Sequence, residues 1–150
     1  MDKKESLSDL SSKITNSSTE MVVMTDNIGF EQVNALFLKG HKIFGSSNLA
    51  DLMSKVEICD KSITWYYFGE FESKDVYNLL KVKNIKYLAS ISNLEVAQKT
   101  SNTCEKMSMM RSVFIKVNFG QDSSGCNYEK CLDFYSEVYD HCPYIAKIHY

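Results

Sequence analysis

The sequence predicts an α/β protein built on a parallel sheet. Short apolar segments rich in β-branched and aromatic residues alternate with segments whose apolar residues recur every three or four positions. The short connections favour right-handed crossovers and strands covered on both faces. With 150 residues, 44% of them apolar, one domain spanning residues 1–150 is expected. Periodicity alone leaves an open doubly wound sheet and part of an eight-stranded barrel as alternatives.

Each element follows from its own pattern. Val33, Leu36 and Phe37 form one apolar face that Gly40 can end, and the other helices repeat such a stripe. The expected helices are residues 6–16, 30–39, 47–55, 73–82, 93–107 and 128–139. The expected strands are residues 20–25, 41–44, 63–68, 87–91, 113–118 and 145–148. Trp65, the single tryptophan, falls on the third strand and is expected to be buried with its N–H satisfied.

Composition excludes several classes of function. The net charge is -2, from 17 basic and 19 acidic residues, so no charge excess indicates nucleic acid or a membrane surface as a partner. No apolar run reaches transmembrane length, and no signal-peptide core follows the charged first residues. A cytoplasmic protein is the simplest expectation. The five cysteines, an odd number, argue against a disulfide framework, and no metal site is expected from their spacing.

A series of short motifs then points to a family. Residues 25–29 (TDNIG) end the first strand, 44–47 (FGSS) the second, 65–69 (WYYFG) the third and 116–118 (KVN) the fifth. In order and spacing they resemble the pyridoxal-phosphate homeostasis proteins, single-domain relatives of the alanine racemase N-terminal barrel. The corresponding family segments read SKTKP, FGEN, WHFIG and QVN. The resemblance covers nearly the whole chain.

The resemblance decides between the two architectures. It implies a partial (β/α)8 TIM-type barrel of about six parallel strands with crossover helices. The chain would be a divergent, C-terminally shortened member that lacks the last two strand–helix units. Six strands cannot close this barrel, so exposed sheet edges are expected.

The resemblance also predicts what is lost. In the family, a lysine at the end of the first strand holds pyridoxal phosphate as a Schiff base, and Asp26 stands at that position here. A carboxylate cannot form an imine. The family pocket would correspond to Asp26, Ser47, Phe68 and Asn118, with pyridoxal phosphate as the implied cofactor. The expected function is that of a degenerate, non-enzymatic relative, a pseudoenzyme without catalytic residues that retains at most a weak contact with vitamin B6. The alternative is a protein-interaction module whose sheet edges bind a second copy or another protein.

Other residues carry competing interpretations. Asp26 could act as a base, although capping of the following helix or plain solvation is favoured. Glu70 and Glu72 could form a carboxylate pair, but a position near a helix start is favoured. Lys116 and Lys147 could supply an imine from other strands, and nothing in the sequence singles out either.

Overall fold

The computed structural model describes residues 7–14, 18–120 and 125–149. Six parallel strands form one sheet in the order β1-β2-β3-β4-β5-β8. Its strands are β1 Val23–Met24, β2 Ile43–Ser46, β3 Thr64–Tyr67, β4 Ile85–Ile91, β5 Arg111–Ile115 and β8 Ile145–His149. The α-helices are α1 Leu7–Ile14, α2 Phe30–Leu38, α3 Leu49–Ile58, α4 Val76–Leu80, α5 Leu94–Lys106 and α6 Cys131–His141, the last preceded by the 3-10 turn Tyr128–Lys130. Residues 6, 15 and 16 of the first expected helix lie outside the described residues.

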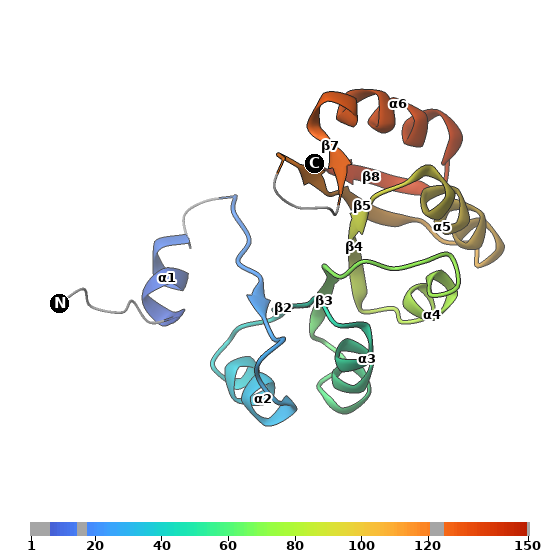
Figure 1. The fold of residues 1–150 in the computed structure, drawn as a ribbon. Coiled ribbons are helices and arrows are strands. Elements are labelled where there is room, and N and C mark those ends of the chain that lie inside the picture. The colour runs from blue at the N-terminus through green and yellow to red at the C-terminus, as the bar shows by residue number, and fades with distance from the viewer. Residues whose placement is uncertain (1–6, 15–17, 121–124, 150) are drawn as a thin grey trace.

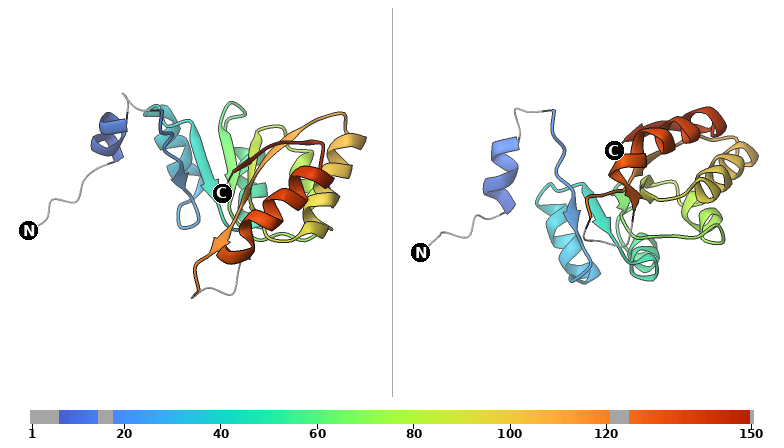
Figure 2. Two further views of the ribbon diagram at one scale, coloured as in Figure 1. Left: turned by 90° about the horizontal axis from the view of Figure 1, so that it is seen from above. Right: turned by 45° about the horizontal axis from the view of Figure 1, so that its top comes forward.

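The sheet curves, and helices α2 to α6 line its outer face in chain order (Figure 1). Figure 2 shows α5 and α6 lying side by side outside β5 and β8. A doubly wound sheet would instead carry helices on both faces. Within the described residues, β1 and β8 are the two edges of the sheet. The expected partial barrel of about six parallel strands is therefore confirmed.

The hydrophobic core lies between the sheet and these helices. Phe44 and Trp65 are fully buried neighbours on β2 and β3, with ring centroids 5.8 Å apart. Val33, Leu52 and Leu79 reach the same core from α2, α3 and α4. Burying one such side chain contributes about 1.5–3 kcal/mol. The prediction of a buried Trp65 is confirmed, but its indole Nε1 finds no acceptor among the described residues, so the expected hydrogen bond is wrong.

The second strand begins and ends later than residues 41–44. Gly45 and Ser46 continue the parallel pairing, opposite Tyr66 and Tyr67. A Cβ on Gly45 would lie 2.6 Å from the ring of Phe68, so a side chain there would collide with that ring. The apolar pattern missed these positions because one has no side chain and the other is polar.

The expected fifth strand, residues 113–118, is divided. β5 ends at Ile115, and Val117–Asn118 forms β6, which pairs in parallel with β7, Cys126–Asn127, as a separate two-stranded ribbon. Apolar residues continue to alternate through the break, at Val113, Ile115 and Val117, so periodicity gave no sign that the chain leaves the main sheet there. Asn118 therefore lies on this ribbon.

Candidate functional site

The carboxyl ends of parallel strands are where barrels carry their functional groups. Asp26 follows β1 and is bound to the loop after β2. Its Oδ1 accepts hydrogen bonds from the hydroxyl of Ser46 at 2.8 Å and from the backbone N–H of Ser47 at 2.7 Å. The structure thus brings together two of the expected pocket positions, Asp26 and Ser47. Partial burial raises the pKa of Asp26, but these hydrogen bonds outweigh it and leave the pKa below its usual value, so the group is a carboxylate at neutral pH.

Asp26 does not cap the helix that follows it, so that interpretation is wrong. Gly29 is the N-cap of α2, and its N–H donates to the side-chain oxygen of Gln32 at 2.7 Å. Through its hydrogen bonds with Ser46 and Ser47, Asp26 instead links the end of β1 to the segment that leads into α3. The sequence gave no signal for this link, because its two sides are twenty residues apart.

A buried lysine lies behind Asp26. Lys55 on α3 is only 4% exposed, and its Nζ donates to the backbone oxygen of Thr25 at 2.6 Å and to Asp51 Oδ2 at 2.6 Å. Thr25 directly precedes Asp26, so an ammonium group does stand close to the end of β1. Sequence reasoning missed it, although the spacing of Asp51 and Lys55 is that of an ion pair on one helix face.

The loops after β2 and β3 approach each other closely. A Cβ on Gly69 would lie 2.1 Å from the backbone oxygen of Ser47, so only glycine fits there without a shift. The backbone oxygen of Phe68 accepts a 2.5 Å hydrogen bond from the hydroxyl of Ser90, at the end of β4. The ends of β1 to β4 are therefore linked through Asp26, Ser47, Gly69 and Phe68. Asn118 is engaged elsewhere, since its Oδ1 accepts from the N–H of Gly120 at 2.8 Å.

The other candidate residues are not assembled into a site within the described residues. Glu72 forms a 2.8 Å ion pair with Lys74, and both side chains are 73% exposed. For Glu70, the structure gives a backbone contact, a 3.0 Å hydrogen bond from the hydroxyl of Tyr67. Lys116 lies between β5 and β6, and its backbone oxygen accepts from Cys126. The side chain of Lys147 lies outside the described part of the chain.

A pocket of about 430 Å³ lies on the concave face. Its walls come from β3, the residue after it, β4, β5 and the segment before β1, and are formed by Tyr66, Phe68, Tyr87, Phe114, Ser18, Glu20 and Val22. The rings of Tyr66 and Tyr87 stack with centroids 4.4 Å apart. The Tyr66 hydroxyl donates to Glu20 Oε2 at 3.0 Å. Burial, and then the neighbouring Glu20 carboxylate, raise the pKa of Tyr66, which stays a neutral hydrogen-bond donor.

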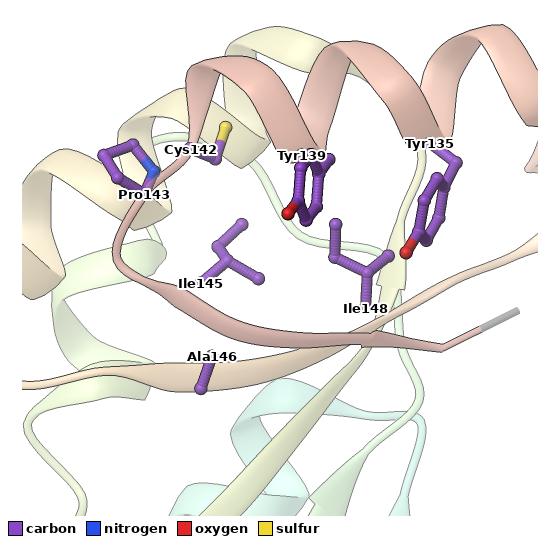
Figure 3. Close-up of a pocket in the computed structure, with 7 residues that line it drawn as sticks. All are labelled: Tyr135, Tyr139, Cys142, Pro143, Ile145, Ala146 and Ile148. Carbon is purple, nitrogen blue, oxygen red and sulfur yellow. The ribbon is translucent and has the colours of Figure 1, made fainter.

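A second pocket, of about 550 Å³, lies at the free edge of the sheet. Figure 3 shows Tyr135 and Tyr139 projecting from α6 toward β8, while Ile145 and Ile148 project from β8 toward the helix. Tyr139 is 69% exposed. The pocket is therefore an open groove of mixed polar and apolar lining that lies along an edge strand. None of the helices in the described part of the chain is long and apolar enough to cross a membrane.

No family model matches the chain. Curated relatives do match it: the pyridoxal phosphate homeostasis protein of Schizosaccharomyces pombe is 23% identical over 67% of this chain and 44% of its own length. That of Synechocystis is 21% identical over 71% of this chain and 49% of its own length. The chain thus spans about half the length of the curated relatives it matches.

Solved structures place the fold in the same group. PipY of Synechococcus elongatus superimposes with a TM-score of 0.76 at 12% identity, over 88% of this chain and 63% of PipY. PipY has also been solved with pyridoxal phosphate bound, with a TM-score of 0.72 at 10% identity over 88% of this chain and 62% of PipY. An alanine racemase of Clostridium difficile gives a TM-score of 0.71 at 14% identity over 93% of this chain and 38% of the racemase. Together with the curated relatives, these matches confirm the resemblance inferred from the strand-end motifs: the chain is similar in sequence to the pyridoxal phosphate homeostasis proteins and has an alanine racemase-like fold.

Proposed function

We propose that this chain is a non-enzymatic relative of the pyridoxal phosphate homeostasis proteins that does not hold the cofactor covalently at the end of β1. The observation that supports this proposal is the identity of residue 26 and its hydrogen bonding. The carboxylate of Asp26 stands at the position expected for the imine-forming lysine and is committed to Ser46 and Ser47. A carboxylate supplies neither the amine nor the nucleophile that Schiff-base formation needs.

Lys55 does not replace the missing amine. An imine requires a neutral, accessible amine, but the Lys55 side chain is 4% exposed and its Nζ is held by the oxygens of Thr25 and Asp51. Lys55 also extends from α3, on the outer face of the sheet (Figure 1). The residues at this strand end therefore do not fit covalently bound pyridoxal phosphate. Any contact with vitamin B6 would be non-covalent, and weaker than in a relative that keeps the lysine.

Borohydride trapping tests this proposal. The chain is incubated with pyridoxal phosphate and reduced with borohydride, and lysine adducts are located by peptide mass spectrometry, with PipY treated in parallel. We expect scattered, substoichiometric labelling of exposed lysines and none at Lys55. The absorbance band of a protein-bound imine should also be missing. One stoichiometric adduct on a single lysine, whether Lys55, Lys116 or Lys147, would overturn the proposal.

Asp26→Lys extends this test. The substitution restores an amine at the expected position but removes the carboxylate that accepts from Ser46 and Ser47. We expect no tight binding of pyridoxal phosphate by this variant, because the surrounding groups are arranged to donate to an anion. Micromolar binding with a new imine band would mean that the pocket had lost only its lysine.

A second function is favoured by the edge of the sheet. We propose that two copies of the chain associate by pairing the free edge of β8 in one copy with the free edge of β1 in the other. Within the described residues, each of these strands pairs on one side only. In a closed barrel the last and first strands pair in parallel, and a second copy can supply the same partner. The groove between Tyr139 and Ile148, which carries both tyrosine and isoleucine side chains, would then be covered by the incoming copy (Figure 3).

Sedimentation of the 150-residue chain at several concentrations tests this association. We expect the weight-average mass to rise with concentration. Tyr139→Glu should weaken the association by placing a charge in the groove. Leu132→Glu is the matched control, because Leu132 is 75% exposed on the same helix but does not line the groove. A compact monomer at all concentrations, or an equal effect of both substitutions, would contradict the proposal.

A further inference from the structure

We propose that the concave face of the sheet binds a small organic cation, such as an aromatic or quaternary ammonium compound, against an aromatic wall from β3, β4 and β5, with Glu20 as the counter-charge. This pocket shares Phe68 with the linked strand ends but does not include Asp26. Its residues Glu20 and Val22 precede β1, whereas Asp26 follows that strand. The inference rests on three features: the shape and walls of the pocket, the single charge in its lining, and the hydrogen bond that orients this charge.

The walls have the composition of a ligand pocket. A volume of about 430 Å³ falls in the range that small molecules occupy, and four of the seven lining side chains are aromatic. Tyr66, Tyr87 and Phe114 form a continuous cluster, with Tyr66 to Tyr87 at 4.4 Å and Tyr87 to Phe114 at 5.5 Å between centroids. Phe68 extends the cluster at 6.0 Å from Tyr66. Interiors of eight-stranded barrels are usually filled by branched aliphatic residues, so this aromatic lining is a departure.

The electrostatics of the pocket select a positive ligand. Glu20 is the charged residue among those that line it, and its carboxylate accepts from the Tyr66 hydroxyl at 3.0 Å. One such bond uses a fraction of the acceptor capacity of a carboxylate, so Glu20 can also accept from an N–H donor. Aromatic faces attract cations through their quadrupole, and a carboxylate adds to that attraction. A phosphate or carboxylate ligand would instead be repelled by Glu20, so this pocket does not suit pyridoxal phosphate.

One cationic side chain lies near this pocket. The Nζ of Lys86 lies 5.4 Å from the centroid of the Tyr87 ring, within the range of a cation–π contact. Lys86 is exposed and does not line the pocket. It therefore adds a positive charge near the aromatic wall without occupying the pocket. A bound cation would experience this charge as a modest repulsion, screened by solvent.

Three aromatic probes of similar size but different charge test whether binding depends on the charge of the ligand or on its shape. Benzyltrimethylammonium, benzyl alcohol and benzoate are titrated into the protein and followed by isothermal calorimetry and by shifts of aromatic NMR signals. We expect saturable binding of benzyltrimethylammonium, about tenfold weaker binding of benzyl alcohol, and no binding of benzoate. Raising the salt concentration should weaken binding of the cation more than that of the alcohol. Equal affinity for the three probes, or binding of none of them, would overturn the proposal.

Variants then place the site. Glu20→Gln keeps the shape of the side chain and removes its charge, and we expect a five- to tenfold loss of affinity for benzyltrimethylammonium, with little change for benzyl alcohol. Glu31→Gln is the matched control, because Glu31 is an exposed carboxylate on α2, outside the pocket. Lys86→Met should leave the affinity unchanged or raise it up to about twofold. Melting curves check that each variant is folded. An unchanged affinity in Glu20→Gln, or an equal loss in Glu31→Gln, would mean that the cation binds elsewhere and that the assignment is wrong.

Discussion

The two faces of the sheet are both rich in aromatic residues, but they are built differently. On the helix-facing side, Phe44 and Trp65 are fully covered by α2, α3 and α4. On the concave side, Tyr66, Tyr87 and Phe114 mainly cover one another and leave a pocket. Alternate residues of β3 therefore point to opposite faces: Trp65 packs into the closed core, and Tyr66 lines the pocket on the concave side. We therefore expect the first face to contribute more to the free energy of unfolding than the second.

The largest expected effect is on the helix-facing side. Trp65→Ala removes the largest fully buried side chain and should lower the free energy of unfolding by roughly 3–5 kcal/mol. Phe114→Ala, on the concave face, is expected to cost roughly half as much, because its ring is only partly buried and leaves no closed cavity. Urea denaturation measures both. Equal losses would mean that the two faces contribute alike to stability.

Gly69→Ala should give the next largest loss of stability, in the loop that follows β3. The added Cβ would press on the backbone oxygen of Ser47 and on the Tyr67 ring, so the loop has to move, at a cost of about 1–3 kcal/mol. Gly29→Ala is the control, since the nearest atom would lie 3.7 Å away, an ordinary contact. Thermal melts of the two variants should separate clearly. Matching melting temperatures would show that the loops after β2 and β3 are not closely apposed.

A smaller effect is expected from Tyr66→Phe. This change keeps the stacked ring and removes the hydroxyl that donates to Glu20, so unfolding should become easier by about 0.5–1.5 kcal/mol. Tyr77→Phe, at a 59% exposed position on α4, should be neutral. The comparison isolates how strongly the segment before β1 is held on the concave face. A neutral Tyr66→Phe would leave that segment without a measurable anchor.

The smallest expected effect depends on pH and concerns Asp26. Its pKa in the folded protein lies below the usual 3.8, so ionised Asp26 stabilises the fold above that value and the contribution is lost as pH falls through the lowered pKa. Asp26→Asn should therefore destabilise the protein most near pH 7, by about 1 kcal/mol or less at this exposed position, and the difference should shrink below about pH 4. Urea melts from pH 3 to 7, with Asp140→Asn as the control, measure it. A difference that grows toward low pH would contradict the assignment.

The sequence predicted the helix-facing side of the molecule better than the concave side. Apolar periodicity located the helices and most strands, because side chains such as Val33 and Leu79 repeat at the spacing that buries them. It missed the end of β2 because Gly45 and Ser46 are not apolar. It joined β5 to β6 because apolar residues continue to alternate from one strand into the other.

The candidate sites depended on contacts that local patterns do not encode. The motifs identified Asp26 and Ser47 as strand-end residues, but not that one accepts a hydrogen bond from the other. The charged pair Asp51 and Lys55 was visible as helix spacing, whereas the bond from Lys55 to the oxygen of Thr25 arises only when α3 docks behind β1. The concave pocket was missed for the same reason. Glu20 and Tyr66 are far apart in sequence and meet only in the folded sheet.

The order of strands also bears on how the chain folds. Each strand of the main sheet pairs with the next main-sheet strand along the chain, and the paired residues are 20 to 35 positions apart. Loop closure over such distances is unfavourable for the first strand pair but becomes easier once a neighbouring strand offers a template. Assembly can therefore proceed from β1 onward during synthesis, with each newly made strand docking on the one before it. The docking of β8 on β5 requires the longest intervening segment, because β6, β7 and α6 must be synthesised between these two strands.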